Sequence, residues 1–182
     1  SSAKPDELKI LNEIMQVIHE YKLHGFVTFI SINSQTELAS FYRYMAKRNS
    51  LFAITALYEP FGLAPIEGMS SGLPAVVTKY GGPSDVLFED GIKYGVLVDV
   101  FKEATIASGI HEALDNYKEY RKLGIQRVLQ KYTWDATTKN YLDAIKQAIA
   151  SNMHSENIEI NPYFLNPKKF YINLDFINKK LL

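Results

Sequence analysis

Hydrophobic spacing divides the first part of the chain into helical and strand-like segments. Apolar side chains between Pro5 and Leu23 recur every three or four positions, which predicts an amphipathic helix. The run at 26–32 is rich in β-branched and aromatic residues and predicts a buried strand, and a second short apolar run follows at 51–57. Between them, Ser34 with Glu37 three positions later forms a capping-box pattern that predicts a helix from Gln35 to about Arg48.

Proline and glycine punctuate the middle of the chain. They bracket a predicted short helix at 65–71, a strand at 74–78 and a helix start at 83–88, and another strand is expected at 94–98. Helical patterns continue over 102–117, 120–131 and 134–150. Short strands that alternate with helices indicate βαβ units. The predicted fold class is therefore α/β, a Rossmann-like parallel sheet flanked by helices.

The composition changes after Ala150. Residues 151–182 are dense in Asn, Ile, Lys and Phe and show no sustained helical period. We interpret 1–150 as the globular domain and 151–182 as a tail. That tail is an extra strand or hairpin, a segment that docks on another domain, or a poorly ordered end, and the last two interpretations are favoured.

Composition and charge exclude several classes of function. The 182 residues contain 20 Lys and Arg against 20 Asp and Glu, so net charge does not draw the chain to nucleic acid or to an anionic membrane. Cysteine is absent, and the 4 histidines share no metal-ligand spacing, so we expect no metal site. Because no apolar run approaches the roughly 20 residues that span a bilayer, we expect a cytoplasmic protein.

Two loops follow predicted strands and lie where parallel sheets bind ligands, at the carboxyl ends of the strands. One loop carries Asn33, Ser34 and Gln35, and the other runs over 58–63. In the second loop, Pro60 fixes one backbone angle and Gly62 permits close approach. The amide groups of 61–63 are therefore candidates to face an anion such as a diphosphate at the start of a helix.

Two carboxylates flank that second loop. Glu59 lies at the strand exit and Glu67 lies eight positions later, and each carboxylate is able to accept a pair of hydroxyl hydrogen bonds from a sugar or a ribose. Taken alone, either glutamate is better interpreted as a solvated surface residue, and Glu67 would then simply favour an early helical position. The joint pattern of strand, Glu59, Pro-Phe-Gly turn, helix and Glu67 favours a binding site instead. Further along, Gly81 and Gly82 form a second turn, for which spacing leaves an ordinary β-to-α turn and a ligand contact equally open.

These residues carry a resemblance to a known family. The stretch EPFGLAPIE, from Glu59 to Glu67, resembles the signature of two glutamates separated by seven residues in retaining nucleotide-sugar glycosyltransferases of the GT-B fold. The surrounding sequence, including GGP at 81–83, is similar to the sucrose-phosphate synthase and sucrose synthase group. The similarity runs from about Pro5 to Ala150 and implies the C-terminal, donor-binding half of such an enzyme.

The resemblance implies a role for each candidate residue. Glu59 would be the catalytic residue and hold hydroxyl groups of the donor sugar, with the amides of Phe61, Gly62 and Leu63 facing the diphosphate and sugar. Glu67 would hold the ribose hydroxyl groups of the nucleotide. The base would lie against the loop and helix start at Ile32, Asn33, Ser34, Gln35 and Leu38.

The implied reaction transfers glucose from UDP-glucose to fructose 6-phosphate, giving sucrose 6-phosphate and UDP, with the nucleotide sugar as substrate and no cofactor. The alternatives are another enzyme of the superfamily, such as a sucrose synthase or a mannosylfructose-phosphate synthase, and a non-catalytic nucleotide-binding or interaction module. Nothing in these residues selects the acceptor.

Two departures from the family pattern bear on activity. The family places an Arg and a Lys over the diphosphate from a segment upstream of Pro5, and it has an N-terminal acceptor-binding domain. Neither lies in this sequence. We therefore expect an N-terminally incomplete donor domain without transfer activity by itself, whose exposed sheet edge and apolar surface favour self-association.

Overall fold

The computed structural model describes residues 5–150, and the chain divides into two compact units at the junction of Thr133 and Trp134. The second unit contributes α7 (Trp134–Ala150). The elements of the first unit are, in chain order, α1 (Pro5–Glu20), α2 (Gln35–Lys47), β1 (Phe52–Ile54), α3 (Leu63–Ser70), β2 (Ala75–Thr78), α4 (Pro83–Leu87), β3 (Phe88–Glu89), β4 (Ile92–Lys93), β5 (Val96–Val98), α5 (Glu103–Asp115) and α6 (Tyr117–Lys131).

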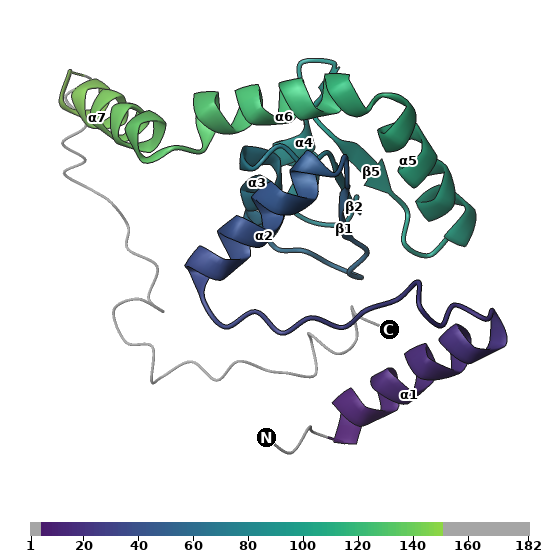
Figure 1. Cartoon of the computed structure of the whole chain (residues 1–182). Coiled ribbons are helices and arrows are strands. Elements are labelled where there is room, and N and C mark those ends of the chain that lie inside the picture. Colours follow the sequence, from purple (N-terminus) through teal and green to yellow (C-terminus); the bar gives the residue numbers. More distant parts are fainter. Residues whose placement is uncertain (1–4, 151–182) are drawn as a thin grey trace, which may run out of the picture. The chain divides into compact units, whose positions relative to one another are not determined.

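A parallel sheet forms the centre of the first unit. Its strand order is β1-β2-β5, with Ala53 opposite Val76 and Val77 opposite Leu97 (Figure 1). Helix α3 connects β1 to β2, and α4 with the β3–β4 pair connects β2 to β5. The prediction of an α/β fold with a parallel sheet flanked by helices is confirmed, although β1 and β5 are shorter than the apolar runs suggested.

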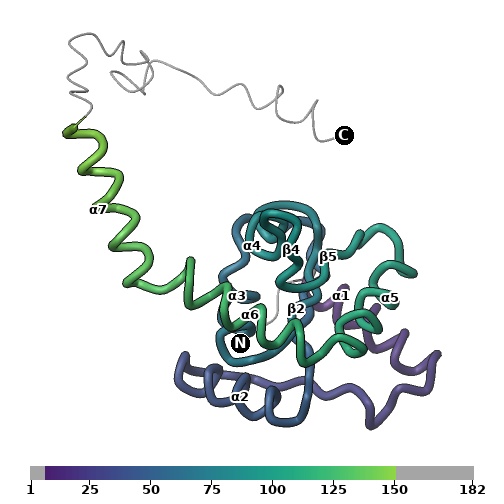
Figure 2. Tube along the Cα trace, turned by 90° about the horizontal axis from the view of Figure 1, so that it is seen from above, coloured from purple at the N-terminus to yellow at the C-terminus, as the bar shows by residue number. Residues whose placement is uncertain are grey.

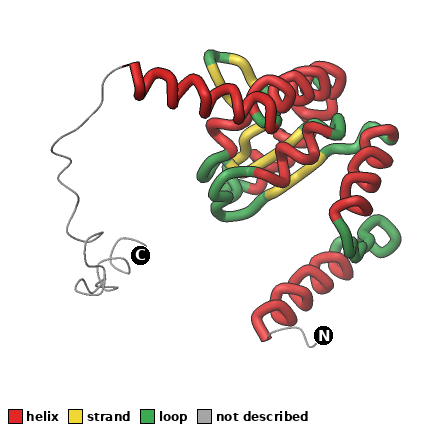
Figure 3. The backbone as a smooth tube through the Cα atoms, turned by 90° about the vertical axis from the view of Figure 1, so that its left-hand side faces the viewer, coloured by secondary structure: helices red, strands yellow, loops and turns green. Residues whose placement is uncertain are grey.

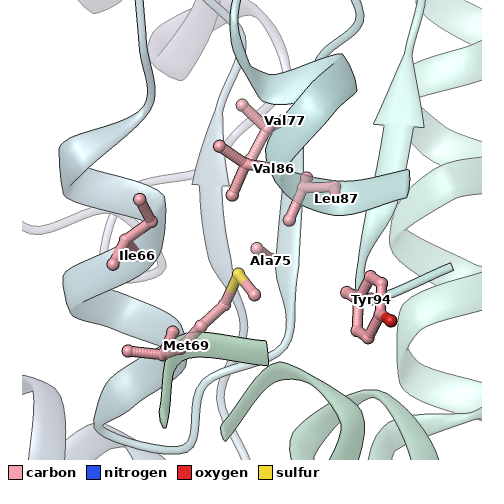
Figure 4. Packing of buried hydrophobic residues seen from close by; sticks show 8 residues of the cluster. Ile66, Met69, Ala75, Val77, Val86, Leu87 and Tyr94 are labelled. Carbon is pink, nitrogen blue, oxygen red and sulfur yellow. The ribbon is translucent and has the colours of Figure 1, made fainter. Parts of the chain in front are cut away.

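Helices cover both faces of this sheet because β2 is apolar on both sides. Successive residues of a strand point to opposite faces. Ala75 and Val77 belong to one buried cluster with side chains of α3, α4 and α6 (Figure 4), whereas Val76 belongs to a second cluster with Ala113 of α5. Figures 2 and 3 show the strands between these helices. A strand buried on both faces is typical of parallel sheets.

The capping-box prediction at the start of α2 is confirmed. The Glu37 amide donates to Ser34 Oγ at 3.1 Å, and the Asn33 amide donates to Glu37 Oε2 at 3.0 Å. The first bond satisfies an amide that a helix start leaves without an intrahelical partner, and the second fixes the residue before the cap. The first turn of α2 is therefore fixed by residues that are neighbours in the sequence.

The predicted strand at 26–32 is wrong. Figure 1 shows the chain between α1 and α2 as a loop, and none of these residues belongs to a strand or pairs in a sheet. Their side chains are also not buried: Phe26 is 84% exposed and Phe29 is 61% exposed. β-Branched and aromatic composition favours an extended backbone, but a strand also requires a neighbouring strand for its hydrogen bonds, and composition does not supply one.

A short antiparallel pair was not predicted. Strands β3 and β4 pair Phe88 with Lys93 and Glu89 with Ile92. The turn between them contains Asp90 and Gly91, both with positive φ (51° and 79°), and Asp-Gly is a preferred sequence for a two-residue hairpin. The predicted tail at 151–182 lies outside the described residues. In the part from 5 to 150, no helix has the length and apolar character needed to cross a membrane.

Candidate donor site

The loop after β1 is joined to the loop after β2. The Glu59 amide donates to the Tyr80 carbonyl at 3.1 Å, the Gly82 amide donates to the Glu59 carbonyl at 3.0 Å, and Glu59 pairs with Gly81 as an isolated parallel bridge. The two loops therefore continue the β1–β2 pairing beyond the strands. This arrangement holds Glu59 at the carboxyl ends of the strands, where the sequence predicted it.

Gly81 and Gly82 allow this close contact. A Cβ on Gly81 would lie 2.1 Å from the Glu59 carbonyl oxygen, and Gly81 also has a φ of +105°. A Cβ on Gly82 would lie 2.6 Å from the Cα of Phe61. Side chains at either position would collide with backbone atoms. The two glycines thus fit the backbone of the Glu59 loop against the start of α4.

The Glu59 carboxylate lies at the start of α3. Its Oε1 atom accepts the amide of Gly62 at 2.9 Å and the amide of Phe61 at 3.4 Å. In this structure, two of the amides assigned to the donor's diphosphate and sugar therefore donate to Glu59. Among the described residues, no group donates to Oε2 of Glu59, so that atom is able to accept a hydroxyl group.

A hollow of about 310 Å³ lies between α2 and α3. It brings together three of the residues predicted to bind the nucleotide, Gln35 and Leu38 from α2 and Glu67 from α3. The other predicted residues do not line it: Ile32, Asn33, Ser34, Glu59, Phe61, Gly62 and Leu63. Ser34 and the Asn33 amide form the cap of α2 instead, so their roles toward a base remain predictions.

Sequence reasoning missed the rest of this hollow. Its remaining lining residues are Ala39, Tyr42 and Arg43 from α2 and Ser70 and Ser71 at the end of α3. Burial raises the pKa of Tyr42, and the negative charge of Glu67 raises it further. Helical periodicity was the available signal. Ala39 and Tyr42 lie four positions after Gln35 and Leu38, Arg43 lies four positions after Ala39, and Ser70 and Ser71 lie three and four positions after Glu67.

The basic side chain at this edge of the sheet is paired. Lys79, directly after β2, contacts Asp99, directly after β5, at 3.1 Å, and the Tyr80 hydroxyl donates to Asp99 at 3.0 Å. The hydrogen bond from Lys79 is the largest cause that lowers the pKa of Asp99. Lys79 thus has a carboxylate partner.

A larger hollow of about 730 Å³ lies elsewhere, next to the turn between α5 and α6. Asn49, after α2, and residues 114–119 with Arg121 line it, and most of these side chains are exposed. It contains none of the predicted site residues. Because Asn49 precedes β1, this hollow lies toward the amino ends of the strands, away from Glu59.

The comparisons with known proteins identify the class. The profile of glycosyl transferases group 1 matches residues 11–127, and the chain belongs to this family. Its fold is that of the GT-B glycosyltransferases. A sucrose-phosphate synthase from Thermosynechococcus elongatus superimposes with a TM-score of 0.63 at 25% identity, over 81% of this chain and 36% of that one. A HepE protein from Anabaena, solved in complex with UDP, shares the fold with a TM-score of 0.62 at 23% identity, over 80% of this chain and 38% of that one.

Curated relatives point to the same group of enzymes. A probable sucrose-phosphate synthase from Thermosipho melanesiensis is 43% identical over 65% of this chain and 27% of its own length. A sucrose synthase from Thermosynechococcus vestitus is 32% identical over 73% of this chain and 17% of its own length. The chain thus spans about a quarter or less of these two relatives.

Proposed function

We propose that this chain is the donor-binding part of a retaining glucosyltransferase that uses UDP-glucose and is of the sucrose-phosphate synthase type. The observation that carries the proposal is the hollow between α2 and α3, in which Gln35, Leu38 and Glu67 meet. Membership of the glycosyl transferase family and similarity to sucrose-phosphate synthases support it.

In this proposal the nucleoside occupies the hollow. The uracil ring lies against Gln35 and Leu38, and the Glu67 carboxylate accepts hydrogen bonds from the two ribose hydroxyl groups. Charged acceptors form stronger hydrogen bonds to such groups than neutral ones do. No metal or cofactor is assigned.

The diphosphate and sugar then extend toward the start of α3. The positive end of the α3 dipole and the amides of Phe61 and Gly62 stabilise the negative charge that develops on the departing UDP. Without a donor, these two amides donate to Oε1 of Glu59. In the proposed complex they donate to the diphosphate instead, and the Glu59 carboxylate accepts a hydroxyl group of the glucosyl ring.

The acceptor in this proposal is fructose 6-phosphate, which gives sucrose 6-phosphate and UDP. A sucrose synthase is the second candidate, because a curated sucrose synthase is also similar over 73% of this chain. Both candidates share the donor site, so they make the same prediction for the binding of UDP.

Glu67→Ala is the test of the donor site. We expect calorimetry to show UDP binding to the parent chain and an affinity lower by roughly ten- to a hundredfold in the variant, because hydrogen bonds to a charged group typically contribute about 1.5–3 kcal/mol. Glu119→Ala is the matched control, since Glu119 is an exposed glutamate on the other hollow. It should bind UDP as the parent does.

The outcomes separate the candidate functions. UDP binding that is weakened by Glu67→Ala and not by Glu119→Ala supports the donor site. A parent chain that does not bind UDP at saturating concentration, or a Glu67→Ala variant with unchanged affinity, contradicts it and favours a structural or interaction module.

A further inference from the structure

Tyr132, the residue directly after α6, contacts the donor loop. Its ring meets the Phe61 ring edge to face, with 6.4 Å between ring centroids and 82° between ring planes. The Arg127 guanidinium lies over the Tyr132 ring, 5.6 Å from its centroid. Within the described chain the Tyr132 hydroxyl has no hydrogen-bond partner, so the ring itself provides the contact.

Arg127 gives Tyr132 a fixed support. It is only 2% exposed, and its guanidinium donates to the Val86 carbonyl at 3.1 Å and the Asp85 carbonyl at 2.8 Å. It also pairs with Glu89 and lies 4.7 Å from the centroid of the Tyr94 ring. A buried cation with this many partners holds α6, α4 and β3 together.

Phe61 is held from two sides. Its backbone lies against Gly82, where an added Cβ would approach within 2.6 Å of the Phe61 Cα, and its ring lies against Tyr132. Phe61 and Gly62 provide the two amides that donate to Glu59. Loss of the contact to the Phe61 ring should therefore shift the two amides at the start of α3 and their hydrogen bonds to Glu59.

We propose that Tyr132 is a positioning residue for the donor loop. Arg127 fixes the position of the Tyr132 ring, and the Tyr132 ring in turn fixes the Phe61 ring. The Phe61 and Gly62 amides and the Glu59 carboxylate are thereby held in their orientation. The inference rests on the proposed function. It adds a residue outside the two-glutamate signature, and it assigns that residue to the diphosphate end of the donor rather than to the nucleoside end.

Comparing ligands with and without the diphosphate distinguishes a positioning role of Tyr132 from a general effect on stability. Tyr132 does not line the hollow that contains Gln35, Leu38 and Glu67. Loss of the ring should therefore weaken the binding of UDP and leave the binding of uridine unchanged. A purely structural defect would weaken both ligands together.

The experiment measures the affinities of uridine and UDP by calorimetry for the parent chain, Tyr132→Leu and Tyr132→Phe. An aromatic pair contributes enough that its loss should lower the affinity for UDP by about three- to tenfold in Tyr132→Leu, with uridine within twofold of the parent. Tyr132→Phe keeps the ring and should retain the parental affinity for both ligands.

Tyr94→Leu is the matched control. Both tyrosines contact the Arg127 guanidinium and pack in or against the same core cluster, but within the described residues only Tyr132 is in ring contact with Phe61. It should leave the ratio of UDP to uridine affinity at the parental value. An unchanged ratio in Tyr132→Leu, or the same change in Tyr94→Leu, overturns the positioning role.

A ligand-free measurement keeps this inference distinct from the proposed function. The exchange rate of the Gly62 amide hydrogen, which is bonded to Glu59, should rise about three- to tenfold in Tyr132→Leu and stay at the parental rate in Tyr94→Leu. An unchanged Gly62 rate in Tyr132→Leu overturns the positioning role. Absence of UDP binding in the parent, in contrast, overturns the proposed donor site, and the exchange rates still decide whether Tyr132 holds the loop.

Discussion

At the scale of single residues, the Glu59 loop depends on two glycines that lie more than twenty positions away in the sequence. Gly81 and Gly82 contact its backbone so closely that neither position has space for a side chain. The hydrogen bonds of Glu59 with Tyr80 and Gly82 then fix where the acidic residue lies. The backbone of 80–82 thus determines the geometry of the candidate site as much as Glu59 itself does.

Gly81→Ala should therefore be strongly destabilising. The added Cβ would lie 2.1 Å from the Glu59 carbonyl oxygen, and the φ of +105° is unfavourable for alanine. We expect urea denaturation to show a loss of about 3 kcal/mol or more in the free energy of unfolding. Gly91→Ala is the control, because Gly91 also has positive φ (+79°) but no atom within 4 Å of its added Cβ. It should lose only about 1 kcal/mol. Equal losses would contradict the close-contact account.

The sequence predicted part of the hollow between α2 and α3. Gln35, Leu38 and Glu67, which the family resemblance grouped as nucleotide-binding residues, meet there. Arg43, Ser70 and Ser71 were missed because their presence depends on how α2 packs beside α3. Helical spacing predicts which residues share a face of one helix, but it does not predict which faces of two helices will pack together.

At the scale of elements, Glu112 of α5 joins two neighbouring elements. It accepts the Tyr120 hydroxyl of α6 at 2.6 Å and pairs with Lys93 of β4 at 3.1 Å. The hydrogen bond from Tyr120 is the largest cause that lowers the pKa of Glu112, and the bond from Lys93 lowers it further. The negative charge of Glu112 thus stabilises the contact between α5 and α6.

This pairing predicts a loss of stability in acid. Because the folded-state pKa of Glu112 is lowered, its contribution is present above the ordinary pKa of a glutamate and is lost as the pH falls through the lowered value. Urea denaturation should show that the free energy of unfolding falls less between pH 6 and pH 3 in Glu112→Gln than in the parent. Glu119→Gln, an exposed substitution on α6, should show the parental decrease. If the free energy of unfolding of Glu112→Gln fell by as much as that of the parent, this account would be contradicted.

The elements that the sequence predicted well are those whose signals are local. The cap of α2 and the start of α4 at Pro83 depend on residues next to the helix end. The segment at 26–32 was predicted wrongly because strand formation depends on a distant partner. The β3–β4 pair had a local signal in Asp90 and Gly91, and it was missed because its strands are only two residues long.

At the scale of the whole molecule, the described residues expose many large apolar side chains. On α1 these include Leu8, Ile10, Leu11 and Ile14, and in the following loop Phe26 and Phe29. Many exposed large apolar side chains on a folded protein are compatible with an area that contacts other protein. The expected self-association remains a prediction, as do the acceptor-binding domain and the assignment of 1–150 to one donor-binding domain.

The most direct test of the donor site is a crystal structure of the chain with UDP. We expect the uracil ring between Gln35 and Leu38, both ribose hydroxyl groups on the Glu67 carboxylate, and the diphosphate at the amides of Phe61 and Gly62. UDP bound elsewhere, for instance at the turn between α5 and α6, or an empty hollow between α2 and α3 at saturating UDP, would contradict the account.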